Sequence, residues 1–373
     1  MESWGGGELF LLNLINGIKD FDFIIASPSG KAHDKFKANN FRLVIINSLR
    51  KMHRKYDRWS FKDKLQILFN IQLSSINLIR VILKGKVDLI LANGNFAALY
   101  AFPAAKLTNR KMIIVQHLLY DKNSLDAKVL ACIGKRVGQL VCVSNAVANR
   151  TEEILNVSDN DKITVIHNGI DLPELDSIKS NNDIINFGFV GSIIRAKSID
   201  VILKAMTSVL MGNKNVFMHI FGTKLNDDDS RCYYDEIQSV IKENELEKKV
   251  VLHGHIDSKD NIYNSIDILI NYSKVEESLG YNILEAMSYS KIVIGTDAGG
   301  IPELIEDKMN GFLVMQNNVE KLTEIINYCI DNFNSEEILN IRKNAREVVM
   351  RKFSLEHFYI KYKNLFDSIL QEK

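Results

Sequence analysis

The segment from Val275 to Met287 decides the fold and most of the functional interpretation: it reads Val-Glu-Glu-Ser-Leu-Gly-Tyr-Asn-Ile-Leu-Glu-Ala-Met. Two glutamates, Glu277 and Glu285, stand eight positions apart, and a loop through Gly280 leads into a predicted helix start at Tyr281. If the residues between them were largely helical, a rise of about 1.5 Å each would separate the carboxylates by roughly 12 Å. Free backbone N–H groups near Gly280 and Tyr281 would favour a phosphate between them. Two carboxylates that can accept hydrogen bonds from hydroxyl groups, on either side of an anion site, suggest a sugar nucleotide as the ligand.

Composition bounds the class of protein. A chain of 373 residues exceeds the size that one core sustains, so two domains of about 170 to 190 residues are expected. The formal net charge of +1 excludes a globally basic nucleic-acid binder, and no nucleic-acid partner is predicted. No run of 18 or more apolar residues occurs, so no membrane span is expected.

The cysteines and the first residues bear on the compartment. The four cysteines are scattered without a C-x-x-C pattern, which is typical of reduced thiols in a cytoplasmic protein. The stretch Met1 to Trp4 has neither a basic nor an apolar region of a signal peptide. We therefore expect a cytoplasmic enzyme. The cysteines are Cys132, Cys142, Cys232 and Cys329.

Short apolar, β-branched runs alternate with helical-period segments along nearly the whole chain, a pattern typical of βα units with parallel sheets. Each half reads as a separate doubly wound domain, so the predicted class is α/β with two Rossmann-like domains. Ligands of such a pair bind at the carboxyl ends of the strands, between the domains. Strands are predicted at 21–25, 43–47, 87–91, 112–115, 140–143 and 163–166, then at 185–190, 216–221, 250–253, 268–271, 292–294 and 312–314.

The domain boundaries follow from composition. The polar stretch 169–183 contains Pro173 and lacks helical periodicity, so it is predicted to join the domains. An aromatic stripe at helical spacing over 355–371 predicts a final helix that docks by core packing. The predicted divisions are an acceptor-side domain at 1–172, a nucleotide-sugar domain at 173–352 and a docking helix at 353–373.

A glycine run, Gly5 to Gly7, opens a predicted helix from Glu8 to Ile18, yet no strand precedes it where a βα unit would supply one. Either the fold starts without that strand or the chain begins late, with a native reading frame that starts upstream. Glycine permits close approach, so Gly6 and Gly7 are expected to bring backbone amides to the phosphates or the acceptor.

Five segments resemble, in order and spacing, the retaining GT-B glycosyltransferases of family 4 (GT4). They are 5–8, 167–171, 190–197, 275–287 and 296–303. The glutamate pair together with Gly299-Gly-Ile-Pro-Glu303 is highly specific for that family, whereas the first glycine run alone is weak. The resemblance covers nearly the whole chain. It implies transfer of a sugar from a nucleotide donor without a metal ion or other cofactor, retaining the anomeric configuration.

The resemblance also implies roles for single residues. Glu285 resembles the glutamate that binds the ribose hydroxyls, and Glu277 resembles the one that contacts the donor sugar near the reacting carbon. Lys197 resembles the lysine on the diphosphate, where a fixed cation stabilises charge that develops on the leaving group. His117 resembles a histidine of the first domain that lies near the donor.

The chain departs from the family at one position. An arginine usually sits five positions before this lysine, where the chain has Ser192. Arg195, on the same loop, is the candidate replacement, against the simpler interpretation of a surface arginine. The full predicted donor-binding set comprises Glu285, Gly280, Tyr281, Asn282, Gly191, Ser192, Arg195, Gly6, Gly7, Gly299 and Gly300.

Two further patterns are weighed. Asp227-Asp-Asp229 contains the D-x-D of metal-dependent transferases, but it precedes a predicted helix whose positive end favours acids, so no metal site is predicted. A basic run with interleaved aromatics suggests either contact with an anionic membrane, where lipid-linked acceptors would lie, or a solvated basic face. Its members include Arg50, Lys51, Arg54, Lys55 and Arg58.

Three functions remain open from the sequence. The first is a retaining transferase that uses a UDP-sugar and a glycan or lipid-linked acceptor in surface polysaccharide synthesis, by front-face displacement. The second is a sugar-nucleotide isomerase. The third is a non-catalytic partner subunit that binds sugar nucleotides, suggested by Ser192 and by the missing first strand.

Overall fold

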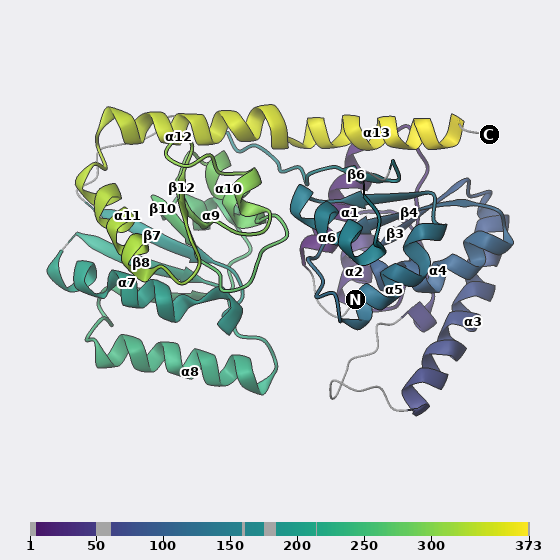
Figure 1. Ribbon diagram of the computed structural model, residues 1–373, viewed down its shortest axis with the longest axis horizontal. Helices are drawn as coiled ribbons and strands as arrows, with labels where there is room; N and C mark the ends of the chain where they lie inside the picture. Colours follow the sequence, from purple (N-terminus) through teal and green to yellow (C-terminus); the bar gives the residue numbers. More distant parts are fainter. Residues whose placement is uncertain (1–4, 50–60, 159–160, 175–183, 214, 372–373) are drawn as a thin grey trace. The chain divides into compact units, whose positions relative to one another are not determined.

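The computed structural model describes residues 5–49, 61–158, 161–174, 184–213 and 215–371. The chain divides into two compact units, one of Met1–Gly169 with Leu355–Lys373 and the other of Ile170–Ser354 (Figure 1). The predicted divisions after 172 and 352 lie a few residues from these. Each unit is an α/β structure with parallel sheets, as the sequence predicts.

The second unit is built on one six-stranded parallel sheet, of order β12-β11-β10-β7-β8-β9. Apart from the partly exposed edge strand β9, its strands are mostly buried, which explains why they read in the sequence as short apolar runs. The order reverses between β7 and β10, as in a doubly wound fold. The strands are β7 (Ile185–Val190), β8 (Val216–Phe221), β9 (Val250–Gly254), β10 (Ile268–Asn271), β11 (Ile292–Thr296) and β12 (Phe312–Val314).

Helices cover both faces of this sheet (Figure 1). The α-helices are α7 (Ile199–Gly212), α8 (Asp228–Glu243), α9 (Lys259–Tyr263), α10 (Tyr281–Ser288), α11 (Val319–Asp331) and α12 (Glu336–Val348). Short turns are η3 (Arg195–Lys197) and η4 (Ile301–Glu303), with a π-turn η5 (Val349–Phe353) after α12.

The first unit contains two separate parallel sheets instead of the single doubly wound sheet that the sequence predicts. One pairs β1 with β2, and the other has the order β3-β4-β5-β6. In a doubly wound sheet the first strand is central. Such a strand would pair with β1 on one side and with β3 on the other. The described residues contain no strand ahead of α1, and β1 and β3 belong to separate sheets. The strands are β1 (Ile24–Ser27), β2 (Arg42–Ile45), β3 (Leu89–Asn93), β4 (Lys111–Gln116), β5 (Gln139–Cys142) and β6 (Ile163–Val165).

The last helix belongs to the first unit. Phe10 of α1 meets Phe358 and Tyr362 edge to face, at centroid distances of 5.6 and 5.5 Å. Phe358, Tyr362 and Phe366 are buried, so the predicted aromatic stripe is core packing. The helices of this unit are α1 (Gly6–Gly17), α2 (Lys31–Ala38), α3 (Phe61–Gly85), α4 (Asn95–Leu107), α5 (Leu125–Ile133), α6 (Asn145–Leu155) and α13 (Leu355–Gln371), with turns η1 (Asn47–Leu49) and η2 (Gly134–Arg136).

Candidate functional site

The point where strand order reverses locates the candidate site of the second unit. β7 and β10 are hydrogen-bonded neighbours there, and their following helices leave toward opposite sides of the sheet. The loops that leave their carboxyl ends are residues 191–198 and 272–280. Open parallel sheets bind ligands outside the carboxyl ends of such strands. Both predicted phosphate and sugar contacts, Lys197 and Glu277, lie on these two loops.

Lys197 and Glu277 are in direct contact. The Nζ atom of Lys197 donates to Oε1 of Glu277 at 2.5 Å, and the two side chains are 26% and 13% exposed. Eighty residues separate them in sequence. Partial burial makes an unpaired charge costly, and the pair neutralises both groups while each retains an exposed side. A phosphate and a sugar hydroxyl can therefore each find a charged partner at one point.

The backbone around Lys197 is fixed by the strand ends beside it. The carbonyl of Ala196 accepts hydrogen bonds from Ser273 Oγ at 2.8 Å and from Lys274 N at 3.0 Å. The backbone N–H of Ser273 donates in turn to Thr296 Oγ1 at 2.8 Å. Sequence reasoning did not single out Ser273, although a polar residue directly after a buried strand was an available signal.

Gly299 and Gly300 support the loop that carries Glu277. The N–H of Gly300 donates to the carbonyl of Glu277 at 2.7 Å. A Cβ atom on Gly299 would lie 2.3 Å from that carbonyl oxygen, and one on Gly300 would lie 2.3 Å from the carbonyl of Ser278. Gly299 also has φ +63°, which favours glycine. These two predicted donor-binding glycines therefore lie where their own backbone contacts the backbone of Glu277 and Ser278.

The start of α10 has the predicted form of an anion site. Gly280 precedes the helix with φ 101° and ψ 70°, a left-handed conformation that glycine adopts without strain. Within the described residues, the backbone N–H groups of Gly280, Tyr281 and Asn282 have no acceptor. These donors and the helix dipole favour a bound anion. Only residues from Tyr281 onward are helical, so the helical-rise estimate of the separation between Glu277 and Glu285 does not apply.

The side chain of Asn282 is hydrogen-bonded within the fold, so its predicted contact with the donor would be made through its backbone N–H. Its Nδ2 donates to the carbonyl of Val190 at 2.8 Å, and its Oδ1 accepts from Asn271 Nδ2 at 2.8 Å. Val190 and Asn271 end β7 and β10, so Asn282 ties α10 to the two strands of the reversal point. The hydroxyl of Tyr281 is buried and has no hydrogen-bond partner among the described residues. Burial, with the nearby charge of Glu285, raises its pKa.

Both carboxylate oxygens of Glu285 are engaged by α9. Tyr263 donates its hydroxyl to Oε2 at 2.7 Å, and Lys259 Nζ lies 2.7 Å from Oε1. Burial and the charge of Glu285 raise the pKa of Tyr263 well above its usual value, so the phenol remains a donor. Lys259 is 45% exposed, whereas Glu285 is 14% exposed. A ribose hydroxyl would therefore compete with the half-exposed Lys259 for Oε1 of Glu285 and leave the contact of Tyr263 with Oε2 in place. Sequence reasoning missed both α9 residues.

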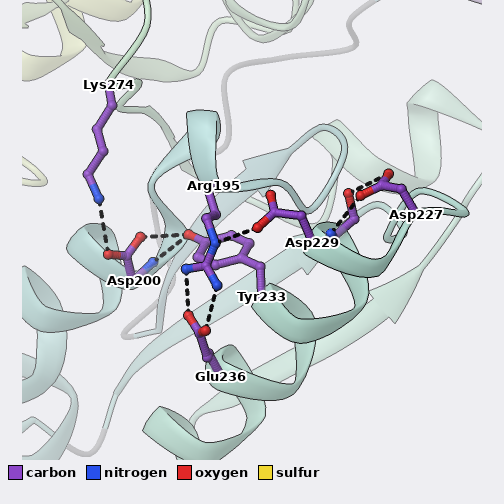
Figure 2. A network of polar contacts seen from close by, with 8 residues as sticks. Arg195, Asp200, Asp227, Asp229, Tyr233, Glu236 and Lys274 are labelled. Atoms are coloured by element: carbon purple, nitrogen blue, oxygen red, sulfur yellow. Dashed lines mark hydrogen bonds and ion pairs between the residues drawn. The ribbon is translucent and has the colours of Figure 1, made fainter. Parts of the chain in front are cut away.

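Arg195, the candidate replacement for the cation missing at Ser192, is bound by carboxylates of α8. Its guanidinium binds Glu236 through two nitrogens, at 2.7 and 2.5 Å, and Asp229 through Nε at 2.9 Å (Figure 2). It also lies 5.2 Å from the ring centroid of Tyr233. These partners belong to α8, so Arg195 fastens the loop after β7 to that helix. Ser192 is exposed, and its replacement by Arg195 stays a prediction.

The D-x-D motif is part of the same helix start. Asp227 caps α8, because its Oδ1 accepts from Ser230 N at 2.8 Å, and Asp229 pairs with Arg195 (Figure 2). Among the described residues no group of three or more His, Cys, Asp or Glu side chains is placed to hold a metal ion. Gly191, the remaining predicted glycine of this unit, touches β8: a Cβ on Gly222 would lie 1.8 Å from the Gly191 carbonyl oxygen.

In the first unit, one amide joins two predicted site residues. Asn93, at the end of β3, donates from Nδ2 to the carbonyl of Gly7 at 3.0 Å, while its Oδ1 lies 2.5 Å from Nε2 of His117. With this amide orientation the proton of His117 is on Nε2, and Nδ1 is the acceptor. Burial lowers the pKa of His117 from 6.5 to about 4, so the ring is neutral near pH 7. Gly6 and Gly7 form the first turn of α1.

Some predictions fall outside this structure. The basic residues proposed for membrane contact, Arg50, Lys51, Arg54, Lys55 and Arg58, lie outside the described residues. Ser144 caps the start of α6, because its Oγ accepts from Val147 N at 3.1 Å.

Comparison with known proteins covers both units. The sequence profile of Glycosyltransferase Family 4 matches residues 4–174, and that of Glycosyl transferases group 1 matches residues 174–348. An uncharacterized glycosyltransferase of Methanocaldococcus jannaschii is 26% identical, over 98% of this chain and 95% of the relative. A poly(ribitol-phosphate) alpha-N-acetylglucosaminyltransferase of Staphylococcus aureus is 24% identical, over 82% of this chain and 60% of the relative. Among solved structures, Anabaena HepE in complex with UDP superposes with a TM-score of 0.81, at 18% identity, covering 99% of this chain and 98% of HepE.

Proposed function

This chain belongs to the GT4-type glycosyltransferases with a GT-B fold, and from that premise we propose that it transfers a sugar from UDP to a glycan or lipid-linked acceptor with retention of configuration. The observation that carries the proposal is the ion pair of Lys197 and Glu277 at the β7/β10 reversal point. It sets a cation for a phosphate beside a carboxylate for sugar hydroxyls. UDP is proposed because the solved structure of HepE holds it.

The chemistry follows from charge development. In a front-face displacement the bond from the anomeric carbon to the phosphate oxygen breaks while the acceptor oxygen bonds to the same face. The departing phosphate oxygen takes the acceptor's proton. Negative charge grows on that phosphate, and Lys197 with the free N–H groups at the start of α10 stabilises it without reorganisation. Glu277 orients the sugar through its hydroxyls, and Glu285 holds the ribose.

These groups are proposed to replace a metal ion and any other cofactor. His117 would enter as a neutral ring, with Nε2 held by Asn93 and Nδ1 available to accept a hydrogen bond. In the absence of an arginine at Ser192, Lys197 and the helix start carry the phosphate between them. We also place the reaction in the cytoplasm, in the synthesis of a surface polysaccharide. The four cysteines form no disulfide with one another, which is typical of proteins in that compartment.

A donor panel tests the proposal. UDP-, GDP- and ADP-sugars are incubated with candidate acceptors in the presence of a chelator, and the product linkage is assigned by NMR. The expected product retains the donor's anomeric configuration, is formed with a uridine donor and needs no added metal. Inversion, or loss of transfer on chelation, contradicts the mechanism. Donor isomerisation, or binding without turnover, would instead support one of the two other functions left open by the sequence.

A further inference from the structure

The long helix α3 has an apolar face that no other part of the described chain covers. Its large apolar side chains there are 41% to 62% exposed, and their spacing places most of them on one side of a helix. From Leu65 to Leu83 the face extends about 27 Å at 1.5 Å per residue. The residues are Leu65, Leu68, Phe69, Leu73, Ile76 and Leu83.

The opposite side of α3 is built into the first unit. Ser74, Ser75 and Ile82 are buried, and Ser74 Oγ donates to Ser48 Oγ of η1 at 2.7 Å. The helix also packs along α4 (Figure 1). Residues Leu65–Gly85 form the one candidate span in the described chain that is long and apolar enough to cross a membrane, yet only 17% of that window is buried. If α3 spanned a bilayer, its packed side would lose its contacts with η1 and α4. If α3 lay on the bilayer surface, lipid would cover its exposed side alone.

A cavity adjoins this face. It has a volume of about 330 Å³ and lies between β2, η1 and α3. Its walls are mixed, with Val44, Ile45 and Val81 beside polar residues such as Asn77, and it shares Leu73 with the exposed face. Arg80 lines it and is exposed. The cavity therefore offers apolar and hydrogen-bonding side chains with one cation at the same surface.

The charges beside the apolar face of α3 distinguish between a second copy of the chain and a lipid surface as its partner. Lys62 near the start of α3 and Arg80, Lys84 and Lys86 near its end are exposed. Asp63 is the one acidic residue of the helix. A twofold contact between two copies of α3 would bring these like charges together, which is unfavourable. An anionic lipid surface instead pairs with them, and apolar Leu and Phe side chains insert beneath the headgroups.

We propose that α3 and the adjoining cavity form a docking surface for an anionic phospholipid bilayer, with Arg80 at the lipid phosphate and the apolar face inserted in the plane of the headgroups. This surface belongs to the first unit and is separate from the donor site of the second. The proposal does not depend on which sugar is transferred, or on whether one is.

Vesicle flotation of the full chain tests the proposal. Phosphatidylcholine vesicles with and without phosphatidylglycerol are compared at low and high salt, and sedimentation velocity without lipid gives the oligomeric state. The expected result is binding to the anionic vesicles that weakens with salt. The double variant Leu68→Glu/Phe69→Glu should reduce that binding at least about tenfold. Arg80→Gln should reduce it about fivefold.

The variants are matched to a control. Leu68 and Phe69 are each 58% exposed, so their replacement leaves the core intact, which thermal unfolding checks. Met211→Glu changes a side chain that is 65% exposed on the second unit and should leave binding unchanged. Absence of wild-type binding to anionic vesicles at low salt would overturn the proposal. So would equal binding by the Leu68/Phe69 variant, or a dimer of the wild type that this variant dissociates.

Discussion

The candidate site residues of the two units are held in opposite ways. In the second unit, Glu277 and Glu285 are paired with lysines, and the glutamates are 13% and 14% exposed. In the first unit, His117 is held by an uncharged amide, and burial keeps its ring neutral. Under the proposed function this difference corresponds to a division of work: the second unit would bind the charged diphosphate and the hydroxyls around it, and the first would present an uncharged hydrogen-bonding group.

The largest effect is expected at Glu277. Glu277→Ala removes the sugar contact and frees Lys197, so turnover should fall about a hundredfold through lost orientation. The affinity for the nucleotide should change little, because the phosphate partner remains. Steady-state kinetics and calorimetry measure the two quantities, with Glu277→Gln as the control that keeps a hydrogen-bond acceptor and part of the turnover. A loss confined to nucleotide affinity would contradict this role.

The pH dependence of stability tests whether the ring of His117 is neutral in the folded protein. The folded pKa of His117, about 4, lies below its usual value of 6.5, so the unfolded chain binds a proton first. The contribution of His117 to the free energy of unfolding should therefore be constant above pH 6.5 and fall between pH 6.5 and 4, by about 3 kcal/mol. His117→Gln should lack this component in urea titrations over the same pH range. Identical pH dependence of the two proteins would show that His117 is not buried as a neutral ring.

A smaller effect is expected at Glu285. Glu285→Ala should weaken binding of a nucleoside diphosphate about tenfold, roughly 1.4 kcal/mol, with turnover at saturation nearly unchanged. Tyr263→Phe is the matched control, since it removes the hydroxyl that holds Oε2 and leaves the carboxylate. It should weaken binding less than Glu285→Ala does. The reverse order in calorimetry would assign the nucleotide contact to the tyrosine.

The smallest effect is expected at Arg195. Because its guanidinium is bound to Glu236 and Asp229, Arg195→Ala should alter nucleotide affinity less than about twofold. Ser192→Arg, which restores the arginine usual in the family, should instead strengthen binding. Calorimetry on both variants compares them. A large loss with Arg195→Ala would mean that this arginine leaves α8 to bind the phosphate.

The fold was predictable where local sequence determines structure. Buried strands such as β7 and β10 appear as short apolar runs, and the start of α8 was marked by the acids that cap it. The division of the first sheet was not predicted, because strand pairing depends on which strands are present to bridge their neighbours. The sequence predicts no strand ahead of the helix that Gly5 opens, but it did not predict that β1 and β3 would belong to separate sheets.

The site was predictable at its charged residues and not at their partners. Lys197 and Glu277 lie 80 residues apart, and no local sequence pattern predicts their contact. Asn93, Ser273 and Tyr263 were missed for the same reason, since each acts on a segment distant in sequence. The sequence left the role of Arg195 open because its carboxylate partners lie 34 and 41 positions away, on α8.

Hydrogen exchange with and without a nucleoside diphosphate tests the central claim most directly, namely that the β7/β10 reversal point binds the donor. The protein is compared alone and with UDP, GDP or ADP. For the nucleotide that binds, amide protection should concentrate at residues 191–198 and 277–286. Protection confined to other segments, or no protection by any of the three, would contradict the assignment of this site.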